Sequence, residues 1–580
     1  MPDSVCVPDS EEFVRGAATY APCTSDGDAG SVGKSAALVS SDVATHHDDG
    51  HDNILASTLA GRLLKRMHDD LPVAFRFDCI HSFQRLAMWL DQHHQGIDKW
   101  SLFAGSCLST HLMSEIVEFL NDLAHVELKS TTNLMSEKDD KKREFLRGQF
   151  PGDAAIMSED VAELAKGEIG DTVLPNCFYA EAGVVCTSRS KLNQNSAENV
   201  DCVQKEFGET GLAYKATRLC IRRHCPYIIS LECVEGLKQI SSPDDPEYVC
   251  DAEWMNRRHR EMGYWALCLD IEAVDWAAWA DRKRMYWAGL RGLRTHKGVS
   301  RWFLDILNGL KPSDPGTVFQ PGDFLSLSYL QRNCDSEKLR ISTHAACGER
   351  HSHSKKDDPG YKNDHLELFR NHGMRWPVDF RVVETRSHII YSGLMPRECE
   401  LVVFLDNVWE PQHDFEFIDV NANSTRIVSK YLKDGNGPKL DDDETPWRVE
   451  TPPTLVGSQT LVVRHRLHPS EMEQFAPKTH CLRLLESFEL FRLQGWSDSY
   501  WNTSSVIADT HEQLERLSNI TGNGYSFAHY LPWTLALLST FGRYCALDGE
   551  EIVAADTNAG NANARDDCLD VGQDSLPGSP

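Results

Sequence analysis

Short apolar runs that end in polar or glycine-containing segments recur along the first half of the chain, beginning near residue 71. Runs of this length predict buried β-strands, because a buried strand stops where the polarity changes. The seven predicted strands lie within residues 100–107, 125–129, 154–160, 179–186, 226–237, 263–270 and 283–290. A helix after the first strand is predicted by apolar residues at helical spacing, Leu112, Met113, Ile116, Val117 and Leu120. Alternating strands and helices predict a layered α/β domain.

The pattern changes between residues 300 and 478. Here β-rich runs at 378–384, 401–405, 415–420 and 460–465 are separated by Pro, Gly and Asp. These runs predict a mainly β second domain with long loops. Helical periodicity returns over 482–496, and a last apolar helix is predicted from Leu531 to Phe541.

The two ends of the chain differ from the rest in composition. Residues 1–70 are rich in Ser, Asp, Gly and Ala and hold twelve acidic against five basic residues, and residues 546–580 hold eight against one. Segments with few aromatic residues and high net charge are expected to be disordered. The expected organisation is therefore a first domain over 71–298, a second over 299–479, a return to the first over 480–545, and two disordered acidic ends.

Charge and composition limit the classes of function. The net charge of −28 argues against indiscriminate binding to a polyanion, although a local basic cleft is compatible with it. No apolar run approaches the ~20 residues needed to cross a bilayer, so no membrane partner is expected. The first residues lack the order of a secretory signal, and the 18 cysteines are scattered, which indicates reduced thiols in a cytosolic or nuclear compartment.

Cys186 is the candidate nucleophile. It ends the predicted strand at 179–186, where the sequence turns to Thr, Ser and Arg, and open α/β sheets place their sites at such strand ends. Arg189 and Lys191 follow closely, and cations near a thiol favour the thiolate. The alternative is that Cys186 is a small buried hydrophobic residue.

The turn Phe103-Ala104-Gly105 is the candidate nucleotide-binding loop. A strand, a tight glycine turn, a helix and a second strand with an acidic residue form the usual arrangement, in which the acid binds ribose hydroxyls. Glu127 lies about twenty residues beyond the turn and is the candidate acid. An ordinary strand–turn–helix would give the same pattern.

Two groups of histidine and cysteine residues could in principle bind a metal. Neither has the spacing of a standard zinc site, and both are interpreted as tail or loop residues, so no metal is expected. The first group is His46, His47 and His51, and the second is Cys334, His344, Cys347, His351 and His353.

In their order along the chain, these segments resemble the DNA (cytosine-5) methyltransferase family over about 100–298 and 480–545. Phe103-Ala104-Gly105 is similar to the opening cofactor loop, Glu127 to the ribose-binding acid, and Asp160 to the acid near the adenine ring. The resemblance also extends to the last motif of the family, Gly522-Asn523-Gly524. It implies S-adenosylmethionine as the cofactor.

The catalytic motifs of that family have counterparts as well. Cys186 stands at the nucleophile of the Pro-Cys loop, Glu232 at the glutamate of Glu-Asn-Val, and Arg282 and Arg284 at the two-arginine motif. The resemblance implies a Rossmann-like methyltransferase sheet with an inserted, mainly β target-recognition domain. It also implies covalent methylation of cytosine C5 in duplex DNA, on a base flipped out of the helix. Residence in the nucleus would follow from that substrate.

Four neighbours of these motifs depart from the family pattern. Val185 replaces a Pro, Cys107 a usual Gly, Cys233 an Asn that helps to order the nucleophile loop, and Ala280 a Gln. None of these changes deletes a reacting group. Two alternatives stay open: an RNA (tRNA) cytosine-5 methyltransferase, and a catalytically inactive DNA-binding or regulatory paralogue.

Overall fold

A computed structural model describes residues 73–150, 156–166, 177–190, 196–240, 248–276, 282–293, 298–312, 360–379, 383–391, 394, 396–420, 447–449, 460–467, 469–485, 487–496, 520 and 525–544. All structural statements below concern these residues. None of the helices they form is both long enough and apolar enough to span a bilayer.

The first sheet has seven strands in the order β3-β2-β1-β4-β5-β7-β6. The pairs from β3 to β5 are parallel, and β7 is antiparallel to both of its neighbours. This is a Rossmann-like α/β sheet, as the sequence predicted. The strands are β1 Gly96–Leu102, β2 Lys129–Ser136, β3 Ile156–Ser158, β4 Tyr179–Gly183, β5 Ile228–Cys233, β6 Tyr264–Glu272 and β7 Lys283–Arg291.

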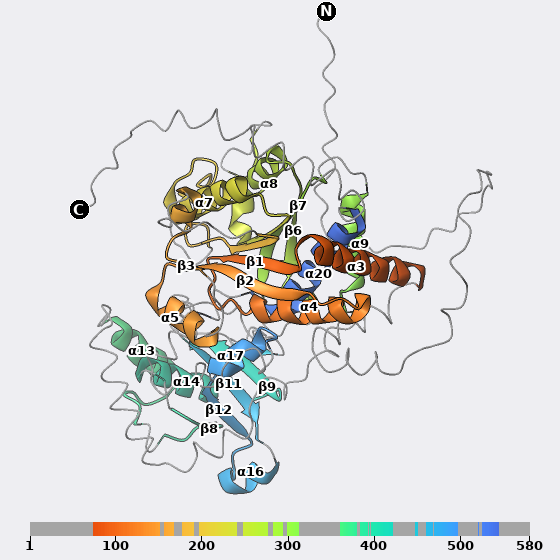
Figure 1. Ribbon diagram of the computed structural model, residues 1–580. Coiled ribbons are helices and arrows are strands. Elements are labelled where there is room, and N and C mark those ends of the chain that lie inside the picture. The colour runs from red at the N-terminus through yellow and green to blue at the C-terminus, as the bar shows by residue number, and fades with distance from the viewer. Residues whose placement is uncertain are drawn as a thin grey trace, which may run out of the picture. The chain divides into compact units, whose positions relative to one another are not determined.

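Helices cover both faces of this sheet (Figure 1). One core contains apolar side chains of α3 Val73–His93, α4 Ser109–Ala124, α9 Val299–Gly309 and α20 Phe527–Tyr544. The opposite core contains side chains of α6 Val161–Lys166, α7 Gly208–His224 and α8 Asp251–Glu261. The strands buried between these layers are nearly continuous in apolar residues, which explains why the sequence predicted most of them.

The helix predicted after the first strand is α4. Its apolar residues at helical spacing are all buried, and it ends at His125, which adopts a left-handed conformation with φ 53°. The strand predicted over 125–129 is therefore wrong, because β2 begins only at Lys129. Only Leu134–Ser136 of β2 pairs with the short strand β3, so the first half of β2 has little cover and carries polar residues.

A second sheet has five strands in the order β10-β9-β11-β12-β8. Four helices belong to the same stretch of chain, α13 Gly360–Asn371, α14 Pro396–Val408, α16 Pro469–Phe475 and α17 Ser487–Leu493. The described part of this region is thus mixed α and β rather than mainly β. Its strands are β8 His388–Ile389, β9 Phe415–Asp419, β10 Arg448–Val449, β11 Leu461–Arg466 and β12 His480–Leu484.

Two element predictions in this second region are wrong. Residues Leu401–Leu405 lie in α14 rather than in a strand, and all five are buried. A short apolar run buried on every side cannot be assigned by periodicity. Leu482–Leu484 lies in β12 rather than in a helix, and β12 pairs with β11. The second sheet therefore extends past the expected boundary at residue 479.

Candidate active site

Cys186 and Glu232 lie at the ends of two neighbouring parallel strands. Gly183 at the end of β4 is the register partner of Glu232 near the end of β5, and the Val184 N–H donates to the Glu232 carbonyl oxygen at 3.0 Å. Cys186 follows three residues beyond β4, in a turn where the amides of Arg189 and Ser190 donate to its carbonyl at 3.0 and 2.9 Å. Parallel strand order thus places the thiol and the carboxylate at one edge of the sheet.

The two predicted arginines reach the same edge from β7. Because β7 is antiparallel to β5, its first residues lie beside the end of β5, where Tyr286 is the register partner of Glu232. Arg284 Nε lies 2.9 Å from Glu232 Oε1, and Arg282 Nη2 lies 3.8 Å from the same atom. Glu232 and Arg282 are 7% and 2% exposed, so this is a buried ion-pair cluster.

The carboxylate of Glu232 is not saturated by these arginines. Both contacts are within ion-pair distance, yet Oε1 accepts no aligned hydrogen bond in the described structure. Burial lowers the pKa of Arg282 to about 10, with the Arg284 charge as the second cause, so Arg282 stays cationic at neutral pH. A buried, charged and unsaturated carboxylate can bind a further hydrogen-bond donor.

Burial raises the pKa of the Cys186 thiol above its ordinary value. The Arg284 charge is the largest opposing effect, Glu232 raises the pKa, and Arg282 lowers it. Because the net shift is upward, the thiol is protonated at neutral pH and must lose its proton to act as a nucleophile.

The cations that act on Cys186 are not those expected from the sequence. The Arg189 guanidinium donates instead to the carbonyl oxygens of Ser196, at 2.7 Å, and Gly236, and to Gln239 Oε1 at 3.1 Å. Lys191 lies outside the described residues. Arg284 and Arg282, distant in sequence, act on the thiol in their place.

The loop Phe103-Ala104-Gly105 follows β1 at the same edge of the sheet. Phe103 and Gly105 have positive φ angles of 57° and 55°, and the Ala104 N–H donates to the Ser136 carbonyl at 2.8 Å. Gly183 lies between this loop and the catalytic cluster. A Cβ on Gly183 would lie 3.8 Å from Tyr525 Oη and 3.9 Å from both Glu232 Oε2 and the Phe103 carbonyl oxygen. The predicted cofactor loop and the catalytic carboxylate therefore approach one glycine.

The structure does not bring Glu127 to the predicted cofactor loop. Glu127 is exposed and precedes the amino end of β2, whereas the loop lies at the carboxyl end, where Leu102 is the partner of Ser136. The seven steps from Lys129 to Ser136 span roughly 23 Å at 3.3 Å per residue.

Glu137, rather than Glu127, is the acidic residue that contacts the predicted loop. It follows Ser136 directly, is buried, and accepts the Gly105 N–H at 3.1 Å and the Asp139 N–H at 3.0 Å. The signal in the sequence was the apolar pair Leu134-Met135 running into an acidic residue. A hydrogen bond to the glycine of the loop fixes this carboxylate beside the turn.

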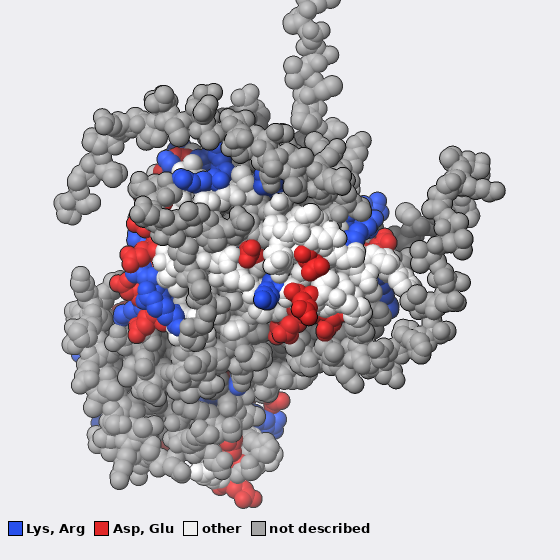
Figure 2. All heavy atoms as spheres, in the orientation of Figure 1, with Lys and Arg blue, Asp and Glu red and all other residues white. Residues whose placement is uncertain are grey.

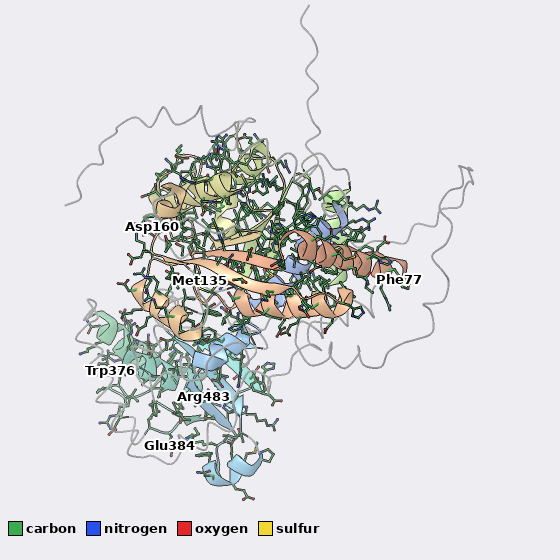
Figure 3. The ribbon with its side chains drawn as sticks, in the orientation of Figure 1. Phe77, Met135, Asp160, Trp376, Glu384 and Arg483 are labelled. Carbon is green, nitrogen blue, oxygen red and sulfur yellow. The ribbon has the colours of Figure 1, made fainter. Side chains whose placement is uncertain are left out.

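Asp160 lies where the sequence placed it, just beyond the end of β3. Its carboxylate accepts the Ala162 N–H at 2.8 Å, and its side chain is half-exposed. Met135, which Figure 3 labels together with Asp160, lies in β2, and β2 pairs in parallel with β3. The acids after β2 and β3 are therefore on one edge of the sheet. Asn523, the last predicted cofactor residue, lies outside the described residues.

Tyr525 is a site residue that the sequence analysis missed. Its hydroxyl is buried without a hydrogen-bond partner in the described structure, and its ring stacks on Tyr530 at 4.5 Å. Burial raises its pKa well above 10, so the hydroxyl keeps its proton and can donate. Its only signal in the sequence was its position two residues after Asn523.

Three of the four departures can be located. Cys107 is buried in the cofactor loop with a positive φ of 49°, and Val185 is half-buried before the nucleophile. Cys233 is buried, and its Sγ lies 3.7 Å from the Val184 carbonyl, so it links the two catalytic strands by a weak S–H bond. Ala280 lies outside the described residues.

No group of three or more His, Cys, Asp or Glu residues in the described part of the chain is placed to hold a metal ion. All members of the two groups that the sequence offered as possible metal ligands lie outside the described residues. The described cysteines are all free thiols.

No family model and no curated protein matches the chain. Solved structures similar to it include the Dnmt2 methyltransferase of S. pombe, with 11% identity, a TM-score of 0.37, and 76% of this chain and 98% of that chain covered. A mutant of DNMT2 from Spodoptera frugiperda has 11% identity, a TM-score of 0.34, and coverages of 76% and 99%. The Entamoeba histolytica methyltransferase EhMeth has 8% identity, a TM-score of 0.33, and coverages of 76% and 98%. Because these identities and TM-scores are low, the fold is assigned from the strand order of the seven-stranded sheet and not from these structures.

Proposed function

We propose that this protein transfers a methyl group from S-adenosylmethionine to C5 of cytosine in DNA. The observation that supports this most directly is the meeting of Cys186, Glu232, Arg282 and Arg284 at the carboxyl edge of a methyltransferase sheet. Glu232 and Arg284 lie on β5 and β7, Arg282 directly precedes β7, and Cys186 lies in the loop after β4. A thiol, an unsaturated carboxylate and two fixed cations are the groups that covalent activation of a pyrimidine needs.

The cofactor loop and two carboxylates fit S-adenosylmethionine. Glu137 is held against the loop by the Gly105 N–H and is placed for ribose hydroxyls, and Asp160 is placed for the adenine end. Gly183, which has no side chain, faces both the Phe103 carbonyl and Glu232 Oε2, each 3.9 Å from the position a Cβ would take. When bound, the cofactor supplies an electrophilic methyl group.

Cys186 has the central role in the proposed reaction. Cytosine C5 is a poor nucleophile, and addition of the Cys186 thiolate to C6 converts C5 into an enamine-like carbon that can accept a methyl group. Loss of the C5 proton to solvent and expulsion of the thiolate then restore the ring and the enzyme. The proton that Cys186 must lose first is held by burial, which Arg284 and Arg282 oppose.

Glu232 and the arginines act on the other side of the ring. A proton held between the Glu232 carboxyl and ring N3 joins the two groups, the other carboxyl oxygen accepts from the exocyclic amine, and Arg282 or Arg284 donates to the ring carbonyl. Negative charge that develops on the ring is neutralised by groups already in place, which lowers the barrier without reorganisation.

Duplex DNA is the proposed partner, with the target base flipped out, because a stacked base cannot present C6 to a thiol. The region containing the five-stranded sheet is the proposed target-recognition domain. Figure 2 shows a group of basic side chains near α7 and α8, a mixed group of basic and acidic side chains beside α5 Asp140–Gln149, and acidic side chains near α4. Residence in the nucleus and the choice of DNA over RNA are parts of the same proposal.

The test is incubation with methyl-labelled S-adenosylmethionine and either duplex DNA or tRNA. Label is expected in DNA, and covalent capture is expected on DNA containing 5-fluorocytosine. Cys186→Ser should abolish both signals, whereas Cys225→Ser, a thiol at the C-terminal end of α7, should leave both unchanged. Label in tRNA alone would identify an RNA enzyme. Absence of label and capture with either nucleic acid would contradict methyl transfer.

A further inference from the structure

Arg189 is a buried cation that the proposed reaction does not use. It is 1% exposed, and its two terminal nitrogens donate to three acceptors, the Ser196 and Gly236 carbonyls and Gln239 Oε1. A buried guanidinium is costly unless its donors are paired. Its Nε has no partner in the described structure, so the hydrogen bonds at the far end of the side chain define its role.

These acceptors lie on two separate segments. Ser196 lies seven residues after Arg189, on the side of the chain away from Cys186. Gly236 and Gln239 lie on the turn η1 Glu235–Lys238 and at its end, immediately after Glu232. Arg189 therefore joins the loop that carries the proposed nucleophile to the segment that carries the proposed acid.

The backbones of the two segments are also in contact at this point. A Cβ on Gly236 would lie 2.0 Å from the Arg189 carbonyl oxygen, which no side chain could tolerate without movement. Glycine is required at position 236 for this close approach. The main chain and the side chain of Arg189 are thus both docked on the exit from β5.

We propose that Arg189 is a positioning residue that fixes the Cys186 loop relative to Glu232. The inference rests on the proposed function, because it takes Cys186 as the nucleophile. Arg189 acts by geometry rather than by charge, since its guanidinium faces the η1 turn, while Arg284 and Arg282 act on the thiol. The planar fork of an arginine can reach acceptors on both segments, which the compact ammonium of a lysine cannot.

The proposed clamp is tested with three variants, Arg189→Met, Arg189→Lys and Gly236→Ala. Arg258→Met is the matched control, because Arg258 is on the surface of α8 and pairs with Glu261 at 2.6 Å. The first readout is single-turnover methyl transfer. Arg189→Met is expected to lower the rate about 10²-fold with an unchanged KM for S-adenosylmethionine, since a misplacement of about 1 Å has that effect. The methyl-transfer rate of Arg189→Lys should lie between those of Arg189→Met and the parent protein. The rate of Arg258→Met should equal that of the parent protein.

The second readout does not require methyl transfer. Alkylation of Cys186 by iodoacetamide is followed across pH by mass spectrometry of its peptide, at a temperature well below the Tm of every variant. If Arg189 holds the loop, Arg189→Met and Gly236→Ala should raise the alkylation rate at high pH several-fold without moving the midpoint of the pH profile.

Three results would overturn the proposal. They are alkylation kinetics unchanged from the parent protein, a midpoint shifted upward as in an Arg284 variant, and a methyl-transfer rate within threefold of the parent. If Arg189→Met does not fold, Gly236→Ala tests the same contact from the other segment. A protein that methylates neither DNA nor tRNA, yet shows the expected alkylation pattern, would retain the clamp and reject the proposed function.

Discussion

Two buried clusters of charge, one in each sheet, differ in how completely they are paired. In the second sheet, Arg464 is fully buried, with its Nε 2.5 Å from Glu416 Oε2, its Nη1 3.4 Å from Asp406 Oδ1, and its guanidinium 4.2 Å from the centroid of the Trp447 ring. Its Nη1 also donates to the Trp409 carbonyl at 2.8 Å. Each of these charges has a partner within the cluster.

The cluster at the edge of the first sheet has the opposite character. Arg284 and Arg282 lie within ion-pair distance of Glu232, but the carboxylate oxygen they face accepts no aligned hydrogen bond in the described structure. The Tyr525 hydroxyl nearby is also without a partner there. Buried polar groups are normally satisfied, so such groups at a strand end indicate a site that a ligand completes.

The difference teaches that burial of charge alone does not identify a site. Backbone conformation separates the two regions in the same way. All non-glycine residues with positive φ in the described structure lie between positions 95 and 225, in the first sheet's half of the chain. Such conformations persist where the surrounding structure over-determines them, and two of these residues, His125 and Cys225, cap the ends of α4 and α7. The following changes test whether the closed cluster serves stability and the open one serves chemistry.

Replacing Arg464 by Met should have the largest effect on folding. The change leaves Glu416 and Asp406 buried without their cation, and breaking a buried pair costs about 3–5 kcal/mol. Denaturant unfolding measures the loss. The control is Arg466→Met on the same strand, whose exposed pair with Asp414 should be worth less than about 1 kcal/mol. Equal losses in the two variants would contradict the distinction.

Replacing Glu232 by Gln, which keeps the size of the side chain and an acceptor oxygen, should lower the rate of methyl transfer by more than it lowers the free energy of unfolding. An amide cannot share a proton with the ring, and loss of such a group costs about 10²-fold, or about 2.7 kcal/mol, in single-turnover rate. The same substitution at Glu235, which is partly exposed and pairs with Lys283 at 2.9 Å, provides the control. A drop in Tm for Glu232→Gln as large as that of Arg464→Met would make the open cluster structural.

Replacing Arg284 by Gln tests the sign of its effect on Cys186. Arg284 lowers the pKa of the thiol against the larger effect of burial, so its removal should raise that pKa further. Less thiolate is then present at neutral pH, and alkylation of Cys186 at pH 7.5 should slow several-fold, with recovery at higher pH. Lys283→Gln is the control, because Lys283 pairs with Glu235. A profile displaced toward lower pH would refute this assignment.

The sequence was sufficient for most strands of the first sheet and for the four residues that the structure brings together at its edge, Cys186, Glu232, Arg282 and Arg284. Strands buried between two helical layers are apolar throughout, and the residues after them are polar, so the ends of β4, β5 and β7 were visible as changes in polarity. Three of the four residues then follow from their places at strand ends. Parallel order brings the ends of β4 and β5 together, whereas β7 is antiparallel to β5 and brings its first residues to the same edge.

The features that the sequence did not predict are those set by how elements distant in sequence pack against one another. The polar first half of β2 concealed a strand because β3 pairs only with its last residues, and the acid was therefore sought at Glu127 instead of Glu137. The buried run Leu401–Leu405 fits a strand or a helix equally well by pattern. The direction of the Arg189 side chain is set by Gly236 and Gln239, which are distant in sequence. Adjacency to Cys186 in the chain was therefore misleading.

The smallest predicted effect concerns the strained cofactor loop. Cys107 has a φ of 49°, a conformation that costs a residue with a Cβ about 1–2 kcal/mol. Its side chain is buried, so the comparison that isolates the backbone is Cys107→Gly against Cys107→Ala, since both remove the sulfur and only one retains a Cβ.

The glycine variant should be the more stable of the pair by about 1 kcal/mol in denaturant unfolding. Ala213→Gly in the regular helix α7 supplies the reverse control and should lose about 1 kcal/mol. If the alanine variant at position 107 were as stable as the glycine variant, the left-handed turn would carry no strain. Positive φ angles would then carry no cost in free energy, and the two regions would differ only in how completely their buried charges are paired.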